Sequence, residues 1–349
     1  MKDADQRPVG IIGAGNFGKA VANIIAENRD VLLFTRQPDK AQRINTTHEI
    51  DGVRLSARVF ATTSLKELAE QCRTIFPIVP SRRFREMMQD LAPYLNPSHF
   101  LIHGTKGFAL RDIDEDELPY RPFTRKNVCL MSEVIRQESC VLRIGTISGP
   151  NLAKEILAGK PAGTLVSSNF EEVIQEARLL LSSERFRVFT STDVKGTELA
   201  GALKNIIAIL SGILAARDMG LNLQALLITK GLAEMIRFAK GWGADEKTFL
   251  GTAGIGDLIA TAMSPDSRNY RFGYRIGSGE RLIQIQANLN ELVEGIRTLI
   301  IVYHLSRHQR LRLPIIHTLY RIVFEDYPIE EAVRYLMTFP FDVDVNFLD

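Results

Sequence analysis

A lysine and an asparagine stand side by side in an otherwise apolar stretch, ELAGALKNIIAIL, which covers residues 198–210. The stretch is typical of a buried helix, because Leu, Ala and Ile dominate and no Pro interrupts it. Residues three and four apart share one face of a helix, and three of the four such neighbours of Lys204 are small, namely Ala200, Gly201 and Ala208. Burying an unpaired ammonium is costly, so Lys204 is either paired or reaches solvent. The small neighbours leave room beside it for a ligand.

A second group of residues has the spacing of a dinucleotide-binding turn. Gly13, Gly15 and Gly18 form G-x-G-x-x-G between an apolar strand-like run and a helix-like run. In such a turn the first glycine permits a tight bend, the second lets the backbone approach a pyrophosphate, and the third allows close helix–strand packing. The pyrophosphate rests on free N–H groups at the helix N-terminus. The pattern predicts an NAD or NADP site, with a ligand-free glycine turn as the alternative.

The choice between NAD and NADP depends on the end of the second predicted strand. NAD-binding folds usually carry Asp or Glu about 20 residues after the glycine turn, but here Thr35 and Arg36 occupy that place. Arg36 could accept a 2′-phosphate, which would allow NADPH. Alternatively, Arg36 stacks on adenine or faces solvent, and the sequence leaves these possibilities open.

Alternating strand-like and helix-like segments must position these residues. The strand-like segments are 8–13, 30–36, 57–63, 73–80, 99–105, 141–149, 162–168 and 185–191. Strands that alternate with helices predict a parallel sheet covered on both faces. After residue 192 the long helical patterns are 193–217, 222–242, 288–310, 313–324 and 328–338. The sequence therefore predicts an α/β fold, with a Rossmann-type, mostly parallel sheet over residues 1–191 and an all-helical domain over residues 192–349.

Length, charge and cysteine content are those of an ordinary globular protein. The 349 residues suggest about two domains, and the formal net charge of +2 gives no reason to expect a nucleic-acid or membrane-surface partner. Cys72, Cys129 and Cys140 form no CxxC pair, so we expect neither a zinc site nor a disulfide framework. The N-terminus lacks a signal-peptide pattern, and the apolar runs are short for a bilayer. We therefore expect a cytoplasmic protein with no stable membrane insertion.

Eight motifs in a fixed order make the chain resemble the cytosolic, bacterial-type NAD(P)-dependent glycerol-3-phosphate dehydrogenases. They are GAGNFGKAVA, VPSRRFREMM, HGTKG, SGPNLAKEI, ELAGALKNIIAI, LITKGLAEM, GIGDLIATAMSPDSRNYRFG and LVEGIRT. The resemblance extends from about residue 8 to residue 338. It implies reversible reduction of dihydroxyacetone phosphate to sn-glycerol 3-phosphate by NADPH or NADH, for phospholipid synthesis. It also implies a Rossmann domain, a helical domain, an active site in the cleft and a homodimer.

The same resemblance assigns roles to individual residues. It makes Lys204 the residue that transfers a proton to the oxygen of the reduced ketone, with Lys106 and Asp257 as further catalytic residues. The implied substrate contacts are Lys106, Gly149, Asn151, Lys204, Asn205, Asp257, Ser267, Arg268 and Asn269. The guanidinium of Arg268 and its neighbours would hold the phosphate. The implied cofactor contacts are Gly13, Gly15, Asn16, Phe17, Gly18, Arg36, Lys106, Ala153, Arg268, Leu292 and Glu294.

Three features stand apart from these motifs. Pro77 falls inside a predicted strand, which requires a place without a ladder hydrogen bond. Residues 111–127 form a polar insertion that is longer than is typical of the family, and we leave its role open. His304 and His308 are spaced to share a helical face and could bind a metal, but no third ligand is evident, so we expect no metal and a solvated basic face.

Two other functions remain as alternatives. One is a related two-domain dehydrogenase that acts on another hydroxyacid or ketone, which would not need Arg268 to hold a phosphate. The other is a non-catalytic NAD(P)-binding sensor, which would keep the glycine turn but have no use for Lys204. The joint presence of Lys106, Lys204, Asp257 and Arg268 favours the dehydrogenase over the sensor.

Overall fold

The structure, a computed structural model, describes residues 6–118, 123–287 and 293–340. The chain forms two compact units, of which the first comprises Met1–Ala109 and Leu130–Thr197 and the second Leu110–Cys129 and Glu198–Asp349. The chain therefore passes between the units three times. The inserted segment 111–127 belongs to the second unit, although the residues on both sides of it along the chain belong to the first.

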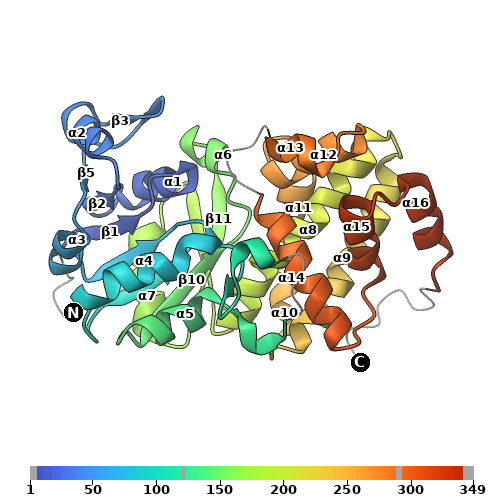
Figure 1. Cartoon of the computed structure of the whole chain (residues 1–349). Coiled ribbons are helices and arrows are strands. Elements are labelled where there is room, and N and C mark those ends of the chain that lie inside the picture. Colours follow the sequence, from blue (N-terminus) through green and yellow to red (C-terminus); the bar gives the residue numbers. More distant parts are fainter. Residues whose placement is uncertain (1–5, 119–122, 288–292, 341–349) are drawn as a thin grey trace. The chain divides into compact units, whose positions relative to one another are not determined.

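Figure 1 shows the sheet on which the first unit is built. It has eight strands in the order β12-β11-β10-β7-β6-β1-β2-β5. Its strands are β1 (Val9–Ile12), β2 (Val31–Phe34), β5 (Val59–Thr62), β6 (Thr74–Pro77), β7 (Phe100–His103), β10 (Arg143–Ser148), β11 (Ala162–Ser168) and β12 (Phe186–Ser191). All neighbouring strands are parallel except β10 and β11, which are antiparallel. Each strand lies within a predicted segment, and the prediction of a Rossmann-type, mostly parallel sheet is confirmed.

The order of the strands sets where a ligand can bind. β1 lies between β2, which follows it in sequence, and β6, which does not, so the order reverses at β1. In open α/β sheets, ligands bind beyond the carboxyl ends of the strands at such a switch point. Pro77 ends β6, where its carbonyl accepts the N–H of Gly104 at 3.0 Å while the N–H of Ile78 resumes the ladder to Ile12 at 2.8 Å. The proline therefore ends the strand at its carboxyl end, on the edge of the sheet where ligands bind in such folds.

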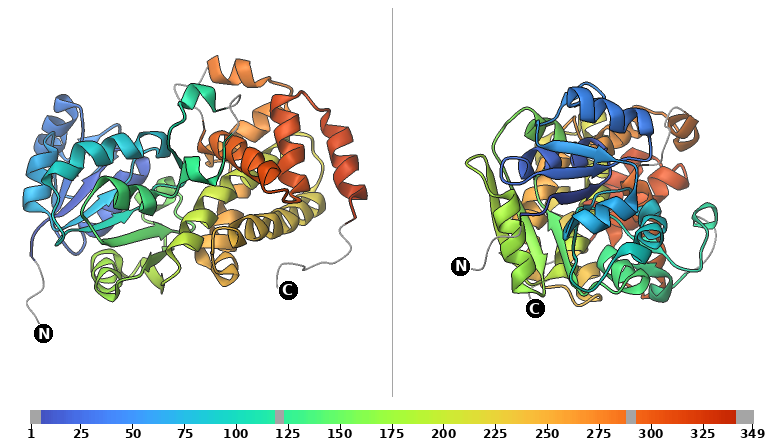
Figure 2. Two further views of the ribbon diagram at one scale, coloured as in Figure 1. Left: turned by 60° about the horizontal axis from the view of Figure 1, so that its bottom comes forward. Right: turned by 90° about the vertical axis from the view of Figure 1, so that its left-hand side faces the viewer.

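Helices lie on both faces of this sheet (Figure 2). They are α1 (Asn16–Ile25), α2 (Pro38–Thr47), α3 (Leu65–Gln71), α4 (Phe84–Leu91), α5 (Met131–Glu138), α6 (Ala153–Leu157) and α7 (Glu171–Leu181). The central strands β1, β2, β6 and β7 are buried along their whole length, as expected for parallel strands that are covered on both faces. Ile11 and Leu33 of the sheet and Val21 of α1 are at most 1% exposed and belong to one core cluster. A two-stranded sheet of β3 (Glu49–Ile50) and β4 (Val53–Arg54) follows α2.

The second unit is helical apart from short strands in the inserted segment. Its helices are α8 (Val194–Ala216), α9 (Leu221–Lys240), α10 (Glu246–Phe249), α11 (Asp257–Ala262), α12 (Arg268–Gly277), α13 (Leu282–Ala287), α14 (Glu294–His308), α15 (Pro314–Phe324) and α16 (Ile329–Thr338). The five long predicted helices are confirmed where the structure describes them, although residues 288–292 lie outside the described part. The inserted segment contains β8 (Ala109–Leu110), β9 (Val128–Cys129) and the 3-10 turns η3 (Glu115–Glu117) and η4 (Arg125–Asn127).

The helix α8 forms the centre of this unit. Among the described residues it is the one helix that is long and apolar enough to cross a bilayer, but 89% of that apolar stretch is buried within the protein. A core helix of a globular protein has the same composition as a membrane span, and burial distinguishes the two. We therefore describe α8 as a core helix, which gives Lys204 an apolar environment on most sides.

Candidate active site

Lys204 lies in the middle of α8 with only 6% of its surface exposed. Its Nζ donates a hydrogen bond to Asp257 Oδ1 and another, at 2.6 Å, to Thr261 Oγ1. Thr261 Oγ1 in turn donates to the backbone carbonyl of Asp257 at 2.7 Å. The lysine is therefore paired rather than exposed, as a buried ammonium requires. An ammonium held by a carboxylate and a hydroxyl has a fixed direction, which a proton-transfer group needs.

The position of Asp257 depends on a wide helical turn before α11. Residues Thr252–Gly256 form a π-helix, η5, which leads directly into α11. A Cβ at Gly254 would collide with the backbone of Phe249, so this winding requires a glycine. Asp257 is the first residue of α11 and is 1% exposed. A carboxylate in the first turn of a helix is stabilised by the partial positive charge of that end.

A chain of hydrogen bonds fixes the amide of Asn205 next to Lys204. The backbone N–H of Gly295 can only donate, and it donates to Asn269 Oδ1 at 3.0 Å. Asn269 must therefore present Nδ2 on its other side, where it donates to Asn205 Oδ1 at 2.9 Å. The Nδ2 of Asn205 is left with a long 3.5 Å contact to Gly201 O. Since both amides are oriented by a backbone donor, Asn205 keeps an N–H of its NH2 group for a ligand.

The start of α12 has the features of an anion site. Ser267 caps the helix by accepting the N–H of Tyr270 at 3.3 Å, and Arg268 is the exposed first residue. The first-turn N–H groups of a helix have no intrahelical partner, and the helix dipole favours negative charge there. A guanidinium beside such N–H groups suits a phosphate. Because Asn269 belongs to the same turn, this anion site and the amide of Asn205 are linked.

Glu294 and Leu292 are the two remaining residues predicted for this unit. Glu294 is the first residue of α14 and is half-buried. Leu292 lies outside the described residues. A Cβ at Gly295 would come within 2.5 Å of Asn269 Oδ1 and 2.9 Å of Asn205 O, so α14 packs directly on the amide pair. The cofactor roles of Glu294 and Leu292 stay predictions.

In the first unit, the glycine turn follows β1 and its three glycines differ in their surroundings. Gly13 has a φ of 124°, in the region that favours glycine, and a Cβ there would collide with Ile78 O. A Cβ at Gly18 would collide with Gly13 O, whereas a Cβ at Gly15 would meet nothing within 4 Å. The first and third glycines are therefore required by the protein itself. The second leaves open space at the N-terminus of α1, which fits a bound pyrophosphate.

The loop that follows β7 lies close to this turn. Gly15 is the N-cap of α1 and Asn16 its first residue, and no side chain caps the helix, so its first N–H groups are available to an anion. A Cβ at Gly104, which follows β7, would lie 3.0 Å from Phe17 Cε1. The glycine turn is therefore packed against the HGTKG loop.

Lys106 lies in that loop and is half-buried. Its Nζ donates to the backbone carbonyl of Gly149, at the end of β10, at 3.2 Å. Asn151 donates to Gly163 O and accepts from Thr164 Oγ1, both at 2.9 Å, so its side-chain amide is held by β11.

Two cofactor positions complete the first unit. Ala153 is the first residue of α6. Arg36 follows β2, with its side chain 49% exposed, and its Nη2 lies 3.3 Å from Glu86 Oε1 and 3.7 Å from Asp90 Oδ2. A 2′-phosphate would have to displace or join these two carboxylates. The predicted roles of Gly149, Asn151, Ala153 and Arg36 stay predictions.

Two features were missed or misjudged from the sequence. Thr261, which holds Lys204, was not singled out, although it follows Asp257 by four residues and so shares its helical face. His304 is half-buried, and its ring centroid lies 5.2 Å from that of Phe123, so the expectation of a solvated basic face is wrong for His304. His308 is exposed as expected.

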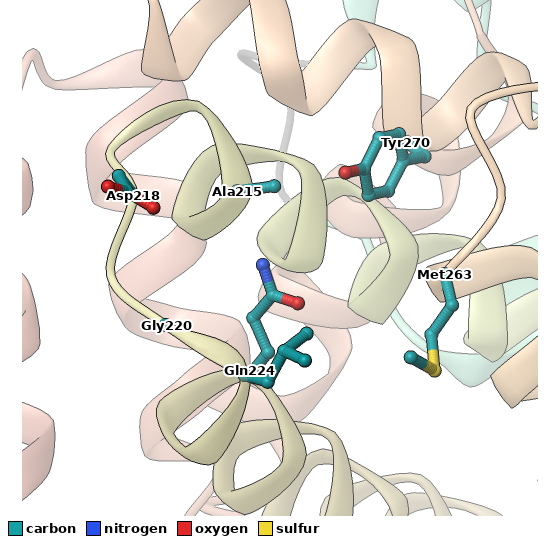
Figure 3. A pocket seen from close by; sticks show the side chains of 7 residues that line it. Ala215, Asp218, Gly220, Gln224, Met263 and Tyr270 are labelled. Atoms are coloured by element: carbon teal, nitrogen blue, oxygen red, sulfur yellow. The ribbon is translucent and has the colours of Figure 1, made fainter.

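A separate pocket of about 280 Å³ lies near the far end of α8 (Figure 3). It is lined by Ala215, Asp218, Gly220, Leu221, Gln224, Met263 and Tyr270. Ala215 follows Lys204 by eleven residues, which corresponds to about 16 Å along a helix. The Ala215 side of the pocket therefore lies far from the lysine, and none of the lining residues is one that was predicted for the site.

Comparisons with known proteins agree with this organisation. The N-terminal and C-terminal family models of NAD-dependent glycerol-3-phosphate dehydrogenase match residues 8–174 and 193–334. The chain is 38% identical over 343 residues to a Teredinibacter turnerae protein named glycerol-3-phosphate dehydrogenase, NAD(P)+, covering 97% of this chain and 96% of that protein. The Pseudomonas aeruginosa PAO1 protein of that name is 37% identical over 349 residues, covering 99% and 98%. The solved glycerol-3-phosphate dehydrogenase of Coxiella burnetii is 30% identical, with a TM-score of 0.83, and the match covers 95% of this chain and 99% of that one.

Proposed function

The chain belongs to the NAD-dependent glycerol-3-phosphate dehydrogenase family, and from that premise we propose how its own residues carry out the reaction. The protein is an NAD(P)-dependent oxidoreductase that reduces dihydroxyacetone phosphate to glycerol 3-phosphate. The observation that carries the assignment of residues is the buried cluster of Lys204 with Asp257 and Thr261.

Proton transfer is assigned to Lys204. When bound, the reduced nicotinamide supplies the hydride that converts the ketone carbon to an alcohol carbon. An N–H of Lys204 donates to the ketone oxygen, its positive charge stabilises the negative charge that develops there, and its proton passes to that oxygen. Asp257 and Thr261 hold Nζ in position before and after the transfer, since both accept hydrogen bonds from it. In the reverse direction the neutral amine takes the proton back.

Substrate binding is assigned to α12 and its link to α8. Arg268 and the first-turn N–H groups of α12 bind the phosphate, and the NH2 group of Asn205 donates to an oxygen of the substrate. Ser267 caps this turn, and Asn269 joins the turn to Asn205. A phosphate held at one end fixes the distance from the phosphate to the ketone, which orients the ketone for reaction.

Cofactor binding is assigned to the edge of the sheet at the switch point. Gly15 and the N-terminus of α1, including Asn16 and Phe17, bind the pyrophosphate. The carboxyl ends of β7 and β10, with Lys106 and Gly149, line the same edge. Arg36 binds a 2′-phosphate, which replaces Glu86 and Asp90 as the partner of the guanidinium. The further contacts assigned to the cofactor are Ala153, Arg268, Leu292 and Glu294.

Arg268→Ala tests the phosphate-binding assignment. With saturating NADPH we expect its KM for dihydroxyacetone phosphate to rise on the order of 100-fold, because a charge-assisted, bidentate contact is lost. The wild type should reduce unphosphorylated dihydroxyacetone slowly. Arg268→Ala should reduce it at the same rate as the wild type, because this substrate has no phosphate for Arg268 to bind. Arg271→Ala, an exposed arginine on the same helix, is the matched control. An unchanged KM in Arg268→Ala would favour the hydroxyacid dehydrogenase alternative.

The wider setting of the reaction is also a proposal. The chain acts as a homodimer in the cytoplasm and supplies glycerol 3-phosphate for phospholipid synthesis. Light scattering at twice the chain mass of 39.1 kDa would support the dimer, and a mass of one chain would contradict it.

A further inference from the structure

The inserted segment 111–127 is held on the helical unit at several points. Phe123 is 4% exposed, and its ring lies against that of His304 on α14, with centroids 5.2 Å apart. The guanidinium of Arg125 lies 3.6 Å from the ring centroid of Trp242, two residues after the end of α9. An arginine stacked on an indole is a favourable cation–π contact. The described residues Phe123 and Arg125 of the insertion are therefore packed against this unit.

The strongest of these contacts joins Glu115 to Arg297. Arg297 lies on α14 and is 6% exposed, so its charge must be compensated inside the protein. Its Nε donates to Glu115 Oε2 at 2.8 Å and its Nη2 to Glu115 Oε1 at 2.5 Å. This is the two-point geometry in which a guanidinium holds a carboxylate most firmly. The two residues are 182 positions apart in the sequence.

Arg297 belongs to the first turn of α14, which contacts the candidate active site. Gly295, two residues earlier, donates its N–H to Asn269 Oδ1, and Asn269 holds Asn205. A Cβ at Gly295 would already be too close to Asn269, so this turn has no spare room. A small displacement of the start of α14 would therefore also displace the side-chain amides of Asn269 and Asn205.

We propose that Glu115 is a positioning residue for the catalytic centre, acting through Arg297 and the first turn of α14 on the amide pair Asn269–Asn205. This proposal rests on the proposed function, since it assigns the amide pair to substrate binding. Glu115 itself touches neither Lys204 nor Asn205 among the contacts found in the described residues. The insertion thus supplies, from a distant part of the sequence, a counter-charge that holds the first turn of α14 in position.

Glu115→Gln tests the proposal by removing the charge while keeping the shape of the side chain. We expect kcat/KM for dihydroxyacetone phosphate to fall on the order of tenfold at saturating NADPH, because misplacement of positioning groups lowers the rate. Asp116→Asn is the matched control, since Asp116 is exposed on the same 3-10 turn and its loss removes the same charge. It should change kcat/KM by less than about twofold.

A double-mutant cycle separates positioning from a general loss of stability. If Glu115 acts through Asn269, then Glu115→Gln should lower kcat/KM by less than about twofold in an Asn269→Ala background. The proposal would be overturned if Glu115→Gln lowered kcat/KM by the same factor in both backgrounds. It would also be overturned if Glu115→Gln lowered the melting temperature but kept the wild-type kcat/KM. Asn205→Ala replaces Asn269→Ala if that variant does not fold. The wild-type rate tests the proposed function by itself: without turnover that function fails, and this proposal fails with it.

Discussion

Thr261 shows how one residue completes a site whose other members are recognisable from motifs. Its hydroxyl accepts from Lys204 Nζ at 2.6 Å and donates to the backbone of Asp257 at 2.7 Å. A hydroxyl can do both at once because it has a donor and two acceptor lone pairs. Thr261 therefore limits how Lys204 can turn within its pocket, while the carboxylate of Asp257 supplies the charge.

Replacing Thr261 by Val keeps the shape of the side chain and removes this hydrogen bond. We expect kcat for dihydroxyacetone phosphate to fall roughly tenfold, since a buried donor on Lys204 loses its acceptor. Thr261→Ser, which keeps the hydroxyl, should retain most of the rate. Steady-state kinetics at saturating NADPH measures both variants, and equal rates for Val and Ser would show that the hydroxyl has no part in the reaction.

The proposed role of Arg36 is to bind the 2′-phosphate that distinguishes NADPH from NADH. Arg36→Ala should raise KM for NADPH about tenfold and leave KM for NADH unchanged, because only NADPH carries a 2′-phosphate for the guanidinium to bind. Parallel assays with the two cofactors measure the effect, and Arg43→Ala on α2 is an exposed control. If both KM values stay at the wild-type level, Arg36 serves only its ion pairs with Glu86 and Asp90.

At the scale of elements, the glycines of the turn after β1 have different roles: Gly18 is needed for folding and Gly15 for binding the cofactor. A Cβ at Gly18 would strike Gly13 O inside the protein, whereas a Cβ at Gly15 would enter open space. Gly18→Ala should therefore lower the melting temperature by several degrees. Gly15→Ala should melt within about 2 °C of the wild type and lose the stabilisation that NADPH gives. Thermal melts with and without NADPH test this; normal NADPH stabilisation in Gly15→Ala would contradict the assignment.

The junction of α9 and α15 carries a buried carboxyl group outside the active site. Glu234 is 1% exposed and accepts the N–H groups of Ile315 at 2.7 Å and Ile316 at 3.0 Å, in the first turn of α15. Burial raises the pKa of Glu234 from 4.5 to about 8, although both N–H donors and Arg237 act in the opposite direction. The folded protein therefore binds a proton at Glu234 that the unfolded chain releases at lower pH.

The pH dependence of stability follows from the sign of this shift. A raised pKa in the folded state contributes stability that is fully present below 4.5 and is lost as the pH rises through about 8. The wild type should therefore lose several degrees of melting temperature between about pH 5 and pH 9, and Glu234→Gln should lose less. Glu331→Gln, an exposed change on α16, is the control. Parallel curves for the wild type and Glu234→Gln would contradict the shift.

At the scale of the whole molecule, local patterns predicted the elements but not the contacts between distant segments. The strands and the five long helices follow from hydrophobic periodicity, which depends on neighbours in sequence. The short helices α10, α11 and α13 were not predicted, because four to six residues give too little periodicity. The ten-residue helix α12 was not predicted either. The antiparallel direction of β11 against β10 also has no local signature, since it depends on how the chain returns to the sheet.

In the candidate site, too, single residues could be predicted from local sequence but contacts between distant residues could not. Lys204, Asn205, Asp257 and Asn269 could be chosen from motifs, and within the helical unit the structure pairs Lys204 with Asp257 and Asn205 with Asn269. The link between Glu115 and Arg297 could not be predicted, because nothing in the sequence near either residue indicates a partner 182 positions away. Membership of the insertion in the second unit is a tertiary property for the same reason.

The measurement that tests this account most directly is the oxidation of NADPH in the presence of dihydroxyacetone phosphate, by the wild type and by Lys204→Ala. We expect turnover by the wild type and a loss of kcat on the order of 1,000-fold in Lys204→Ala, as for removal of a group that both transfers a proton and stabilises an oxyanion. Lys195→Ala, an exposed change on the same helix, should keep the wild-type rate. Stabilisation by NADPH in a thermal melt would show that Lys204→Ala is folded. A folded Lys204→Ala that keeps a rate within tenfold of the wild type would contradict the role of Lys204.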